Sequence, residues 1–553
     1  MIFLVAAALL QDAGALVRSG DSKMAARDYD GAIADYTKAI ELGPNLPVPY
    51  LRRARARRAK RDYDGSIADC TKAIELRPGD KSAFVSRGLA KHDKRDYDGA
   101  AADYTKAIEL DPKYVYAWYD RALTREAQGK IDEALEDYAK AIECDPKYAN
   151  SWFNRGLLRL GRQDHDGAVA DLGRYVELAP KDPEGWYHRG RARRAKGDKL
   201  ALSERLEEAR VQWDGAISDF DQAIRLNGDY VVALIARGKA RFDRKEHDAA
   251  LADYTRAIEL DPKHVSAWYN RGLARFDRKN YDGAVADYTR VLELDPKHAQ
   301  AWYNRALARE AQGKPDLALE DYARAIECDP KFANAHYNRG LLRQALGDHD
   351  GAIEDFDRYI RMCPKDPEGW YARGRARRAK KDFKGAMADH SQAIEIKPDY
   401  ALAFVGRGLA KHDLKQFDAA IEDFTKAIQA DPKSPAAWFN RGASKHEKKD
   451  FDGAIADYGR AIELRPTYAS AFYNRGLARH EKRDFRGAIE DFTAAIAVDP
   501  KFPDAYYSRA RSRRALDDVE GAIADFRASL DLAPPDWEYR KHAEEALRRL
   551  GGK

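Results

Sequence analysis

The chain has 553 residues and is 34% charged, yet 97 basic and 92 acidic residues leave a formal net charge of only +5 at pH 7. One compact core is not expected at this length, and the balance of charge excludes a strongly basic nucleic-acid binder. The cysteines form no CxxC motif and no evident pair, so we expect small buried apolar residues at Cys70, Cys144, Cys328 and Cys363.

The first fifteen residues differ from the rest of the chain. Ile2 to Leu10 is an apolar run, and Ala13-Gly14-Ala15 after it has the small-x-small pattern of a cleavage site. The run is too short to span a bilayer, and no Lys or Arg precedes it. We expect residues 1–15 to be a signal peptide, which favours export to the periplasm slightly over the cytoplasm. A hydrophobic lead-in helix is the alternative.

Residues 16–536 follow a 34-residue pattern, which is clearest in 265–298, VSAWYNRGLARFDRKNYDGAVADYTRVLELDPKH. Apolar residues fall three and four apart, which predicts two amphipathic helices joined by a tight turn, and Pro296 ends the second helix. A large aromatic residue stands fourth, small residues stand eighth, twentieth and twenty-seventh, an aromatic residue stands twenty-fourth and proline thirty-second.

This pattern resembles the tetratricopeptide repeat. Counting back from each proline gives fifteen repeats, which start at 13, 47, 81, 115, 149, 183, 231, 265, 299, 333, 367, 401, 435, 469 and 503. The resemblance implies an all-α fold: a right-handed α-solenoid superhelix of fifteen helix-turn-helix units, in which each pair packs on its neighbours.

Two segments depart from the regular pattern. The sixth repeat carries fourteen extra residues at 199–212, KLALSERLEEARVQ, which are good helix formers and predict a protruding helical extension. A partner site there is the open alternative. Residues 537–553 follow Pro534-Pro535 and predict a C-terminal capping helix, with Asp536 as its N-cap.

A longer repeat lies over the short one. AIECDPK occurs at 141–147 and 325–331, and KDPEGWY occurs at 181–187 and 365–371. Both pairs are offset by 184 residues, which is five repeats plus the insertion. A block of about five repeats was therefore duplicated, and we expect similar surfaces to recur along the chain.

Arginine holds the seventh position in fourteen of the fifteen repeats, aspartate holds the twenty-third in all fifteen, and Lys or Arg holds the eleventh in every one. The seventh and twenty-third positions can approach each other in an antiparallel helix pair. We therefore expect structural ion pairs between Arg271 and Asp287 and between Arg305 and Asp321, with a ligand site as the alternative.

Other candidate motifs point to no chemistry. The RARRAK stretches at 55–60, 191–196 and 375–380 favour an ion-paired face over binding of nucleic acid or another polyanion. His412, His446 and His480 share the twelfth position, but successive helices stand too far apart for one metal ion. The sequence has no HExxH, GxGxxG or Walker motif, so we expect no enzyme, metal or cofactor.

The family resemblance implies that the first helices line a concave groove and that their second, fifth, sixth and ninth positions point into it. The fifth is mostly aromatic, the sixth is asparagine in six repeats, and leucine dominates the ninth. The sixth position resembles the asparagine ladder in the repeat arm of the O-linked N-acetylglucosamine transferases, which holds extended peptide by its backbone. The expected groove residues are Tyr269, Asn270, Leu273, Tyr303, Asn304, Leu307, Tyr337, Asn338, Leu341, Asn154, Asn440 and Asn474.

These patterns favour a non-catalytic scaffold that binds extended segments of partner proteins in the groove. Plain repeat consensus is the other interpretation of the asparagines. Two other functions stay open: polyanion or nucleic-acid binding through the RARRAK helices, which is the less favoured, and a substrate-recruiting arm for a separately encoded enzyme. No transmembrane span is expected, and the sequence does not specify an oligomeric state.

Overall fold

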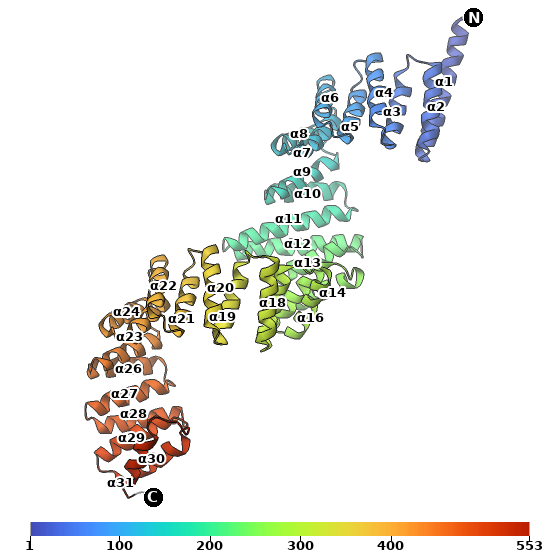
Figure 1. The fold of residues 1–553 in the computed structure, drawn as a ribbon. Coiled ribbons are helices and arrows are strands. Elements are labelled where there is room, and N and C mark those ends of the chain that lie inside the picture. Colours follow the sequence, from blue (N-terminus) through green and yellow to red (C-terminus); the bar gives the residue numbers. More distant parts are fainter. Residues whose placement is uncertain (1, 552–553) are drawn as a thin grey trace. The chain divides into compact units, whose positions relative to one another are not determined.

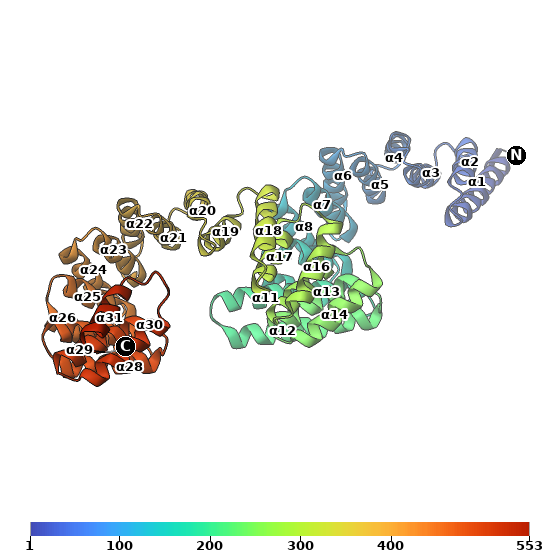
Figure 2. The same cartoon turned by 60° about the horizontal axis from the view of Figure 1, so that its bottom comes forward.

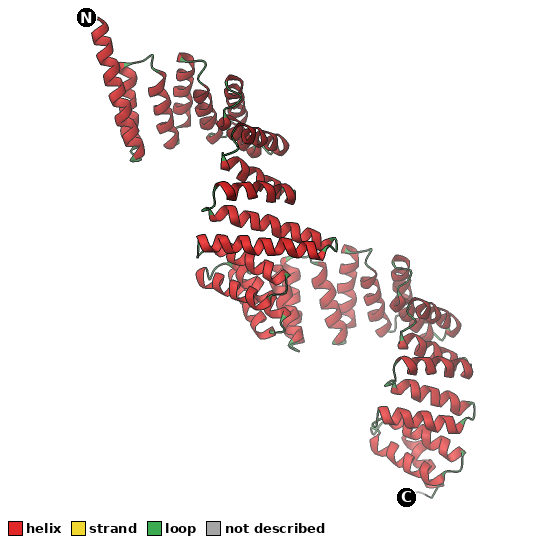
Figure 3. Ribbon diagram, turned by 180° about the vertical axis from the view of Figure 1, so that it is seen from behind, coloured by secondary structure: helices red, strands yellow, loops and turns green. Residues whose placement is uncertain are grey.

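The computed structural model describes residues 2–551, with the side chains of residues 11–551. In this range the chain forms 31 helices and no strand, which confirms the predicted all-α fold of helix pairs (Figures 1 and 3). The helices gather into two compact bodies, residues 1–279 and 280–553, and each body is described by itself.

The N-terminal body contains seven helix pairs and the first helix of the eighth. Its helices are α1 (Ile2–Ala25), α2 (Tyr29–Leu42), α3 (Pro47–Ala59), α4 (Tyr63–Leu76), α5 (Lys81–Asp93), α6 (Tyr97–Leu110), α7 (Val115–Ala127), α8 (Ile131–Cys144), α9 (Ala149–Gly161), α10 (His165–Leu178), α11 (Pro183–Leu202), α12 (Leu206–Leu226), α13 (Val231–Asp243), α14 (His247–Leu260) and α15 (Val265–Asp277).

The C-terminal body continues the pattern from the second helix of the eighth pair. Its helices are α16 (Tyr281–Leu294), α17 (Ala299–Ala311), α18 (Pro315–Cys328), α19 (Ala333–Ala345), α20 (His349–Met362), α21 (Pro367–Ala379), α22 (Phe383–Ile396), α23 (Ala401–Asp413), α24 (Phe417–Ala430), α25 (Pro435–Glu447), α26 (Phe451–Leu464), α27 (Ala469–Glu481), α28 (Phe485–Val498), α29 (Pro503–Ala515), α30 (Val519–Leu532) and α31 (Arg540–Arg549).

The turn between the two helices has a recurring structure, which the second pair illustrates. In the second pair, Arg61 takes a left-handed conformation with φ 65°, and the backbone N–H of Asp62 donates to the carbonyl of Arg57. This arrangement ends the first helix in the manner usual for a left-handed C-terminal residue. The Asp62 side chain then accepts a hydrogen bond from the Gly65 N–H at 2.9 Å and caps the second helix.

Small residues at the eighth position allow the two helices of a pair to pack closely. A Cβ atom on Gly88 would lie 2.7 Å from the ring of Tyr104, which is fully buried at the twenty-fourth position. Ala32, Ala100 and their equivalents in other repeats are also fully buried. The core of such a pair is therefore an aromatic ring of the second helix that packs against a small residue of the first helix.

First helices of consecutive pairs contact one another, for example α3 with α5 and α5 with α7 in the N-terminal body, and α21 with α23 and α23 with α25 in the C-terminal body. Within each body the first helices therefore form one layer and the second helices the other. Side chains that leave the first-helix layer on its free side line the face on which a groove is expected.

The insertion in the sixth repeat lengthens both helices of the pair equally. Helices α11 and α12 have 20 and 21 residues, against 13 and 14 in a regular pair, and they extend past their neighbours (Figures 1 and 2). The structure thus places the predicted helical extension at the tip of one hairpin. At this tip Leu202 and Val211 are exposed.

Both ends of the chain differ from a regular pair. Helix α1 continues through Ala13-Gly14-Ala15 without a break. Ser19 and Lys23, which follow this segment on α1, both bond to Asp35 of α2. No helix within the described residues is long and apolar enough to cross a bilayer.

At the other end, α31 begins only at Arg540, and its N-cap Tyr539 makes no side-chain capping bond. The prediction that Asp536 caps this helix is therefore wrong. The reason is that the chain first turns so that the indole of Trp537 donates to Asp504 at 2.6 Å and packs on Tyr507.

Candidate peptide-binding groove

The fifth-position aromatic rings lie half-buried on the first-helix layer. In the C-terminal body, the Tyr303 ring lies 5.9 Å from Tyr322 and 4.8 Å from Phe332, and the Tyr337 ring lies 5.9 Å from Phe356. The Tyr303 ring thus contacts its own second helix and the residue just before the next repeat, and the Tyr337 ring contacts its own second helix. The remaining part of each ring is left as apolar surface on the groove side.

The predicted asparagines and leucines are also half-buried on first helices. Asn270 and Leu273 lie on α15 beside Tyr269, and the carboxamide of Asn270 donates to the carbonyl of Ser266 at 2.5 Å. The remaining predicted residues are Asn154 on α9, Asn304 and Leu307 on α17, Asn338 and Leu341 on α19, Asn440 on α25 and Asn474 on α27.

Two of the asparagines bond to the tyrosine of the preceding repeat, a contact that the sequence did not predict. Asn338 Nδ2 donates to Tyr303 Oη at 2.8 Å, and Asn154 Nδ2 donates to Tyr119 Oη at 2.9 Å. The two contacts are related by the 184-residue offset, so the duplicated blocks carry the same polar bridge in separate bodies. The bridge fixes the carboxamide so that its nitrogen faces the tyrosine and its oxygen is turned elsewhere.

A second, buried tyrosine near each bridge makes a further hydrogen bond that is also duplicated. Tyr322 Oη donates to Glu310 at 2.9 Å, and its duplicate Tyr138 donates to Glu126 at 3.1 Å. Burial raises the pKa of the Tyr119 phenol to about 12, so this hydroxyl stays protonated near neutral pH.

The fourth repeat breaks the asparagine pattern with a carboxyl group. Asp120 stands in the sixth position on α7, where burial raises its pKa to about 7. Its carboxyl therefore titrates near neutral pH.

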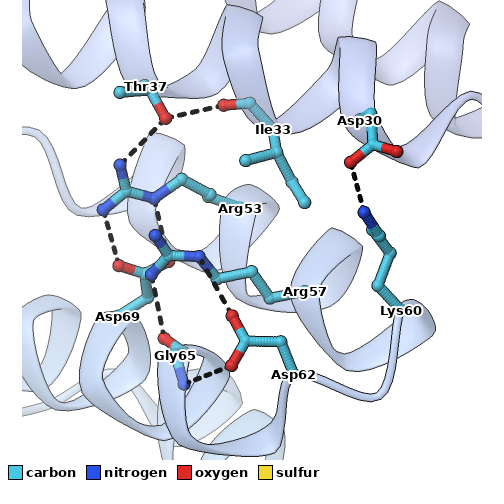
Figure 4. Close-up of polar contacts among 9 residues, drawn as sticks. All are labelled: Asp30, Ile33, Thr37, Arg53, Arg57, Lys60, Asp62, Gly65 and Asp69. Atoms are coloured by element: carbon cyan, nitrogen blue, oxygen red, sulfur yellow. Dashed lines mark hydrogen bonds and ion pairs between the residues drawn. The ribbon is translucent and has the colours of Figure 1, made fainter.

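The charged columns form a network that links the first two repeats (Figure 4). In the second repeat, Arg53 donates from Nε and Nη2 to Asp69 at 2.9 and 2.7 Å, and Arg57 donates to the same carboxylate at 2.9 Å. The third nitrogen of Arg53 donates to Thr37 of the preceding repeat at 3.0 Å. Lys60 also pairs with Asp30 of the preceding repeat. The recurring threonine at the twenty-fifth position was the overlooked sequence signal for these links between repeats.

All fifteen aspartates of the twenty-third column are buried, with at most 7% of each residue exposed. Arg305 donates to both oxygens of Asp321 at 2.9 and 2.7 Å, and Arg309 approaches the same carboxylate at 2.7 Å. Arg271 lies in the N-terminal body, where it donates to Thr255 at 3.2 Å and its guanidinium stacks 4.7 Å from the Trp268 ring. Asp287 is buried in the C-terminal body.

Comparison with known families agrees with these repeated features. Tetratricopeptide repeat models match residues 17–81, 85–149, 205–265, 235–297, 269–333, 337–401 and 473–536, and a further one matches 138–170. A TPR repeat model matches residues 408–449 and 444–483. The chain belongs to the tetratricopeptide repeat family. Repeats of this family form scaffolds for protein–protein interaction. No curated protein matches the chain significantly.

The chain is similar to several solved structures. YrrB, a TPR protein with an unusual peptide-binding site, is 25% identical over 33% of this chain and 95% of its own, with a TM-score of 0.31. Yeast Tom70 is 19% identical over 80% of this chain and 96% of its own, with a TM-score of 0.32. The Cut9–Hcn1 structure from APC/C is 16% identical over 93% and 99%, with a TM-score of 0.36.

Several cavities open on the first-helix layer of this tetratricopeptide repeat protein in the N-terminal body. One of about 560 Å³ lies between α3 and α5, one of about 360 Å³ lies mainly between α11 and α13, and one of about 280 Å³ lies between α1 and α3. Each of the first two is lined by arginines of a RARRAK helix and by apolar side chains of the next first helix. The structure therefore gives the RARRAK stretches of α3 and α11 equivalent places on the first-helix layer.

Two of the three patterned histidines make contacts between repeats, and the third packs on a ring of its own repeat. The Nδ1 atom of His412 lies 2.9 Å from Ser444 Oγ, and that of His480 lies 2.8 Å from Ser512 Oγ. His446 packs its ring 5.4 Å from Phe451. Among the residues described, no group of three or more His, Cys, Asp or Glu side chains is placed to hold a metal ion.

The predicted burial of the cysteines is confirmed only in part. Cys70 is fully buried, whereas Cys144, Cys328 and Cys363 are half-buried, and all four are free thiols. Cys144 lies with its Sγ atom 3.3 Å from the carbonyl of Pro112, at the junction between two repeats.

Proposed function

We propose that this protein is a non-catalytic scaffold whose first-helix layer binds extended segments of partner proteins. The observation that carries the proposal is the duplicated bridge from Asn338 to Tyr303 and from Asn154 to Tyr119. In each bridge the asparagine nitrogen is engaged within the chain. The carboxamide oxygen of a half-exposed side chain is then held in a fixed direction, where it can accept a backbone N–H from a bound peptide.

Such a contact is suited to binding that tolerates variation in sequence. Each hydrogen bond to peptide backbone adds about 1 kcal/mol net, so the ladder alone gives weak affinity. The half-exposed rings of Tyr303 and Tyr337 supply apolar area beside it. Because the oxygens are oriented before the peptide arrives, little side-chain entropy is lost when it binds.

The test begins with a partner captured by affinity pull-down and identified by mass spectrometry. The binding segment of this partner is then titrated calorimetrically against the parent and a variant with Asn304→Ala and Asn338→Ala, which both lie in the C-terminal body. We expect affinity to fall at least tenfold, because two backbone contacts of about 1 kcal/mol each are lost. The helical circular dichroism signal should be nearly unchanged, since these side chains are half-exposed.

Tyr303→Phe is the matched control. It removes the hydroxyl that accepts from Asn338 but keeps both the ring and the carboxamide. We expect this variant to bind within about threefold of the parent, since the acceptor oxygen remains and only its orientation is loosened. If the segment binds the double asparagine variant as tightly as the parent, the asparagines serve only to join repeats.

A further inference from the structure

Three other places on the first-helix layer carry a different kind of surface, which we call a cationic niche. A niche consists of an exposed arginine at the ninth position of one first helix and a small residue at the sixth position of the next first helix. The pairs are Arg55 with Ser86, Arg191 with Ala236, and Arg375 with Gly406. They lie on α3 and α5, α11 and α13, and α21 and α23.

We propose that each niche binds an acidic side chain of the extended partner segment, together with the apolar side chain that neighbours it. The inference rests on the proposed groove function and adds a preference to it. The ladder holds backbone, and the niches select acidic–apolar motifs that recur along the segment.

The third niche has its arginine but not an open space, because Gly406 is buried against the His390 ring, which would lie 2.6 Å from a Cβ atom there. In the first two niches a small sixth residue leaves space where an asparagine stands elsewhere, and this geometry favours such a motif. The first two cavities described above occupy this place, with Arg55 and Ser86 in one lining and Arg191 and Ala236 in the other. Their volumes of about 560 and 360 Å³ fall in the range of ordinary ligand pockets. Leu51 and Leu89 wall the first cavity, and Tyr187 and Ile235 wall the second.

Charge inside the niches is balanced except at the ninth-position arginine and, in the second niche, at Lys239, which lines the same cavity and pairs with no carboxylate in the described part of the chain. The neighbouring arginine at the twelfth position pairs with an aspartate of the next first helix: Arg58 with Asp93 at 2.6 Å, Arg194 with Asp243 at 2.7 Å, and Arg378 with Asp413 at 2.6 Å. These contacts repeat in all three niches and hold the walls together.

Within the described residues, no carboxylate pairs with Arg55, Arg191 or Arg375. Arg191 lies 5.6 Å over the Tyr187 ring and Arg375 lies 5.9 Å over the Tyr371 ring. A guanidinium stacked on an aromatic ring keeps its donors directed outward, and two parallel N–H donors match a carboxylate. Each niche therefore presents an uncompensated arginine, and in the first two niches this arginine stands beside an apolar wall.

This arrangement suits an acidic protein segment better than nucleic acid. A polynucleotide needs a track of uncompensated cations along its backbone and several free stacking surfaces. Here most arginines of the RARRAK stretches are already bound to aspartates, as Arg57 is to Asp69 and Arg377 to Asp389.

The test uses the full chain and two synthetic dodecapeptides, acetylated and amidated so that no terminal carboxylate is present. One consists of three Ser-Asp-Leu-Gly units, and the other has asparagine in place of each aspartate. A dT12 oligonucleotide is the third probe. Calorimetry and fluorescence anisotropy measure the affinity of each. We expect the acidic peptide to bind about tenfold more tightly than its neutral counterpart, with the difference shrinking in 1 M salt.

Arg55→Ser, Arg191→Ser and Arg375→Ser in one chain should abolish the preference between the two peptides. The control chain carries Arg174→Ser, Arg324→Ser and Arg460→Ser, which remove the same charge from exposed second-helix positions that pair with Glu177, Glu327 and Glu463. This chain should keep the preference. Melting curves of both chains check that they fold.

Three results would overturn the proposal in different ways. If both peptides bind equally to the parent and both are weakened by Asn304→Ala with Asn338→Ala, the groove function stands and the niches select nothing. If neither peptide binds, the niches do not take acidic segments, while titration of a captured partner decides the groove function separately. Tighter binding of dT12 than of the acidic peptide, lost in the niche variant, would assign the niches to nucleic acid.

Discussion

Arg305 clamps Asp321 through two parallel hydrogen bonds of 2.9 and 2.7 Å, and residues Arg305 and Asp321 are only 8% and 1% exposed. The same arginine reaches Thr289 of the preceding repeat at 3.0 Å. One side chain thus fixes both the register within its helix pair and the contact with the pair before it. Such a buried charge is costly to strand, although the intact pair adds little net stability.

The first prediction is that Arg305 and Asp321 are energetically coupled. Arg305→Met alone should cost about 2–4 kcal/mol, because Asp321 stays buried with only Arg309. Combining it with Asp321→Leu should cost less than the sum of the single changes. Hydrogen exchange of the α17 and α18 amides measures the local effect in a chain whose unfolding need not be two-state. Additive losses would show that the pair is not coupled. The same cycle tests the untested prediction for Arg271 and Asp287.

A second prediction concerns the fully buried imidazole of His390, which replaces the usual aromatic ring of the core. Neither ring nitrogen has a hydrogen-bond partner in the described structure, and the ring lies between Gly374 and Gly406. Burial above all, together with the nearby Arg378, Arg407 and Arg375, lowers the pKa of His390 to about 4, and Asp423 opposes them. The imidazole is therefore neutral in the folded chain at neutral pH.

Because the folded pKa lies below the unfolded value of about 6.5, the unfolded chain takes up a proton first as pH falls. The stability of the eleventh repeat should be full above pH 6.5 and should decrease by about 3 kcal/mol as pH falls to 4. His390→Phe, which restores the ring type found at Phe356 and Phe424, should reduce this loss. Hydrogen exchange of α22 at pH 7 and 4.5 is the measurement. Equal loss in parent and variant would assign the effect to other groups.

Removal of residues 199–212 should give a folded chain. The deletion joins Asp198 to Trp213 and restores the spacing of the second repeat, where Asp62 precedes Tyr63. It takes four residues from α11, the three-residue loop and seven residues from α12, about four helical turns in all, so we expect the helix pair to keep its phase and its packing. We expect a melting temperature within about 4 °C of the parent, since the deleted tip is largely exposed. Loss of the circular dichroism signal of the fold would show that the hairpin supports its neighbours.

We also predict that the chain is cleaved after Ala15 in its native host. The contacts of Ser19 and Lys23 with Asp35 lie beyond that point, so the first repeat would keep its charged pair. Intact-mass measurement of the native protein is the check. A cytosolic species that begins at Met1 and no shorter species would contradict the prediction.

The sequence by itself determined the elements of this fold. Helix pairs, their turns and the extra hairpin could be predicted because each depends on residues close together in the chain: periodic apolar positions, aspartate caps and the proline after Asp295. The Arg and Asp columns could be predicted for the same reason, since sixteen residues separate Arg305 from Asp321 across one turn.

Only the tertiary structure decided what the first-helix layer presents. The bond from Asn338 to Tyr303, the bond from Arg305 to Thr289 and the cavities beside Arg55 and Arg191 depend on side chains from different helices. Direction and distance there are set by how one helix packs on the next. A linear pattern records which residues recur but not the angle at which successive helices meet. That packing angle places Asn338 against Tyr303 and leaves the cavities beside Ser86 and Ala236.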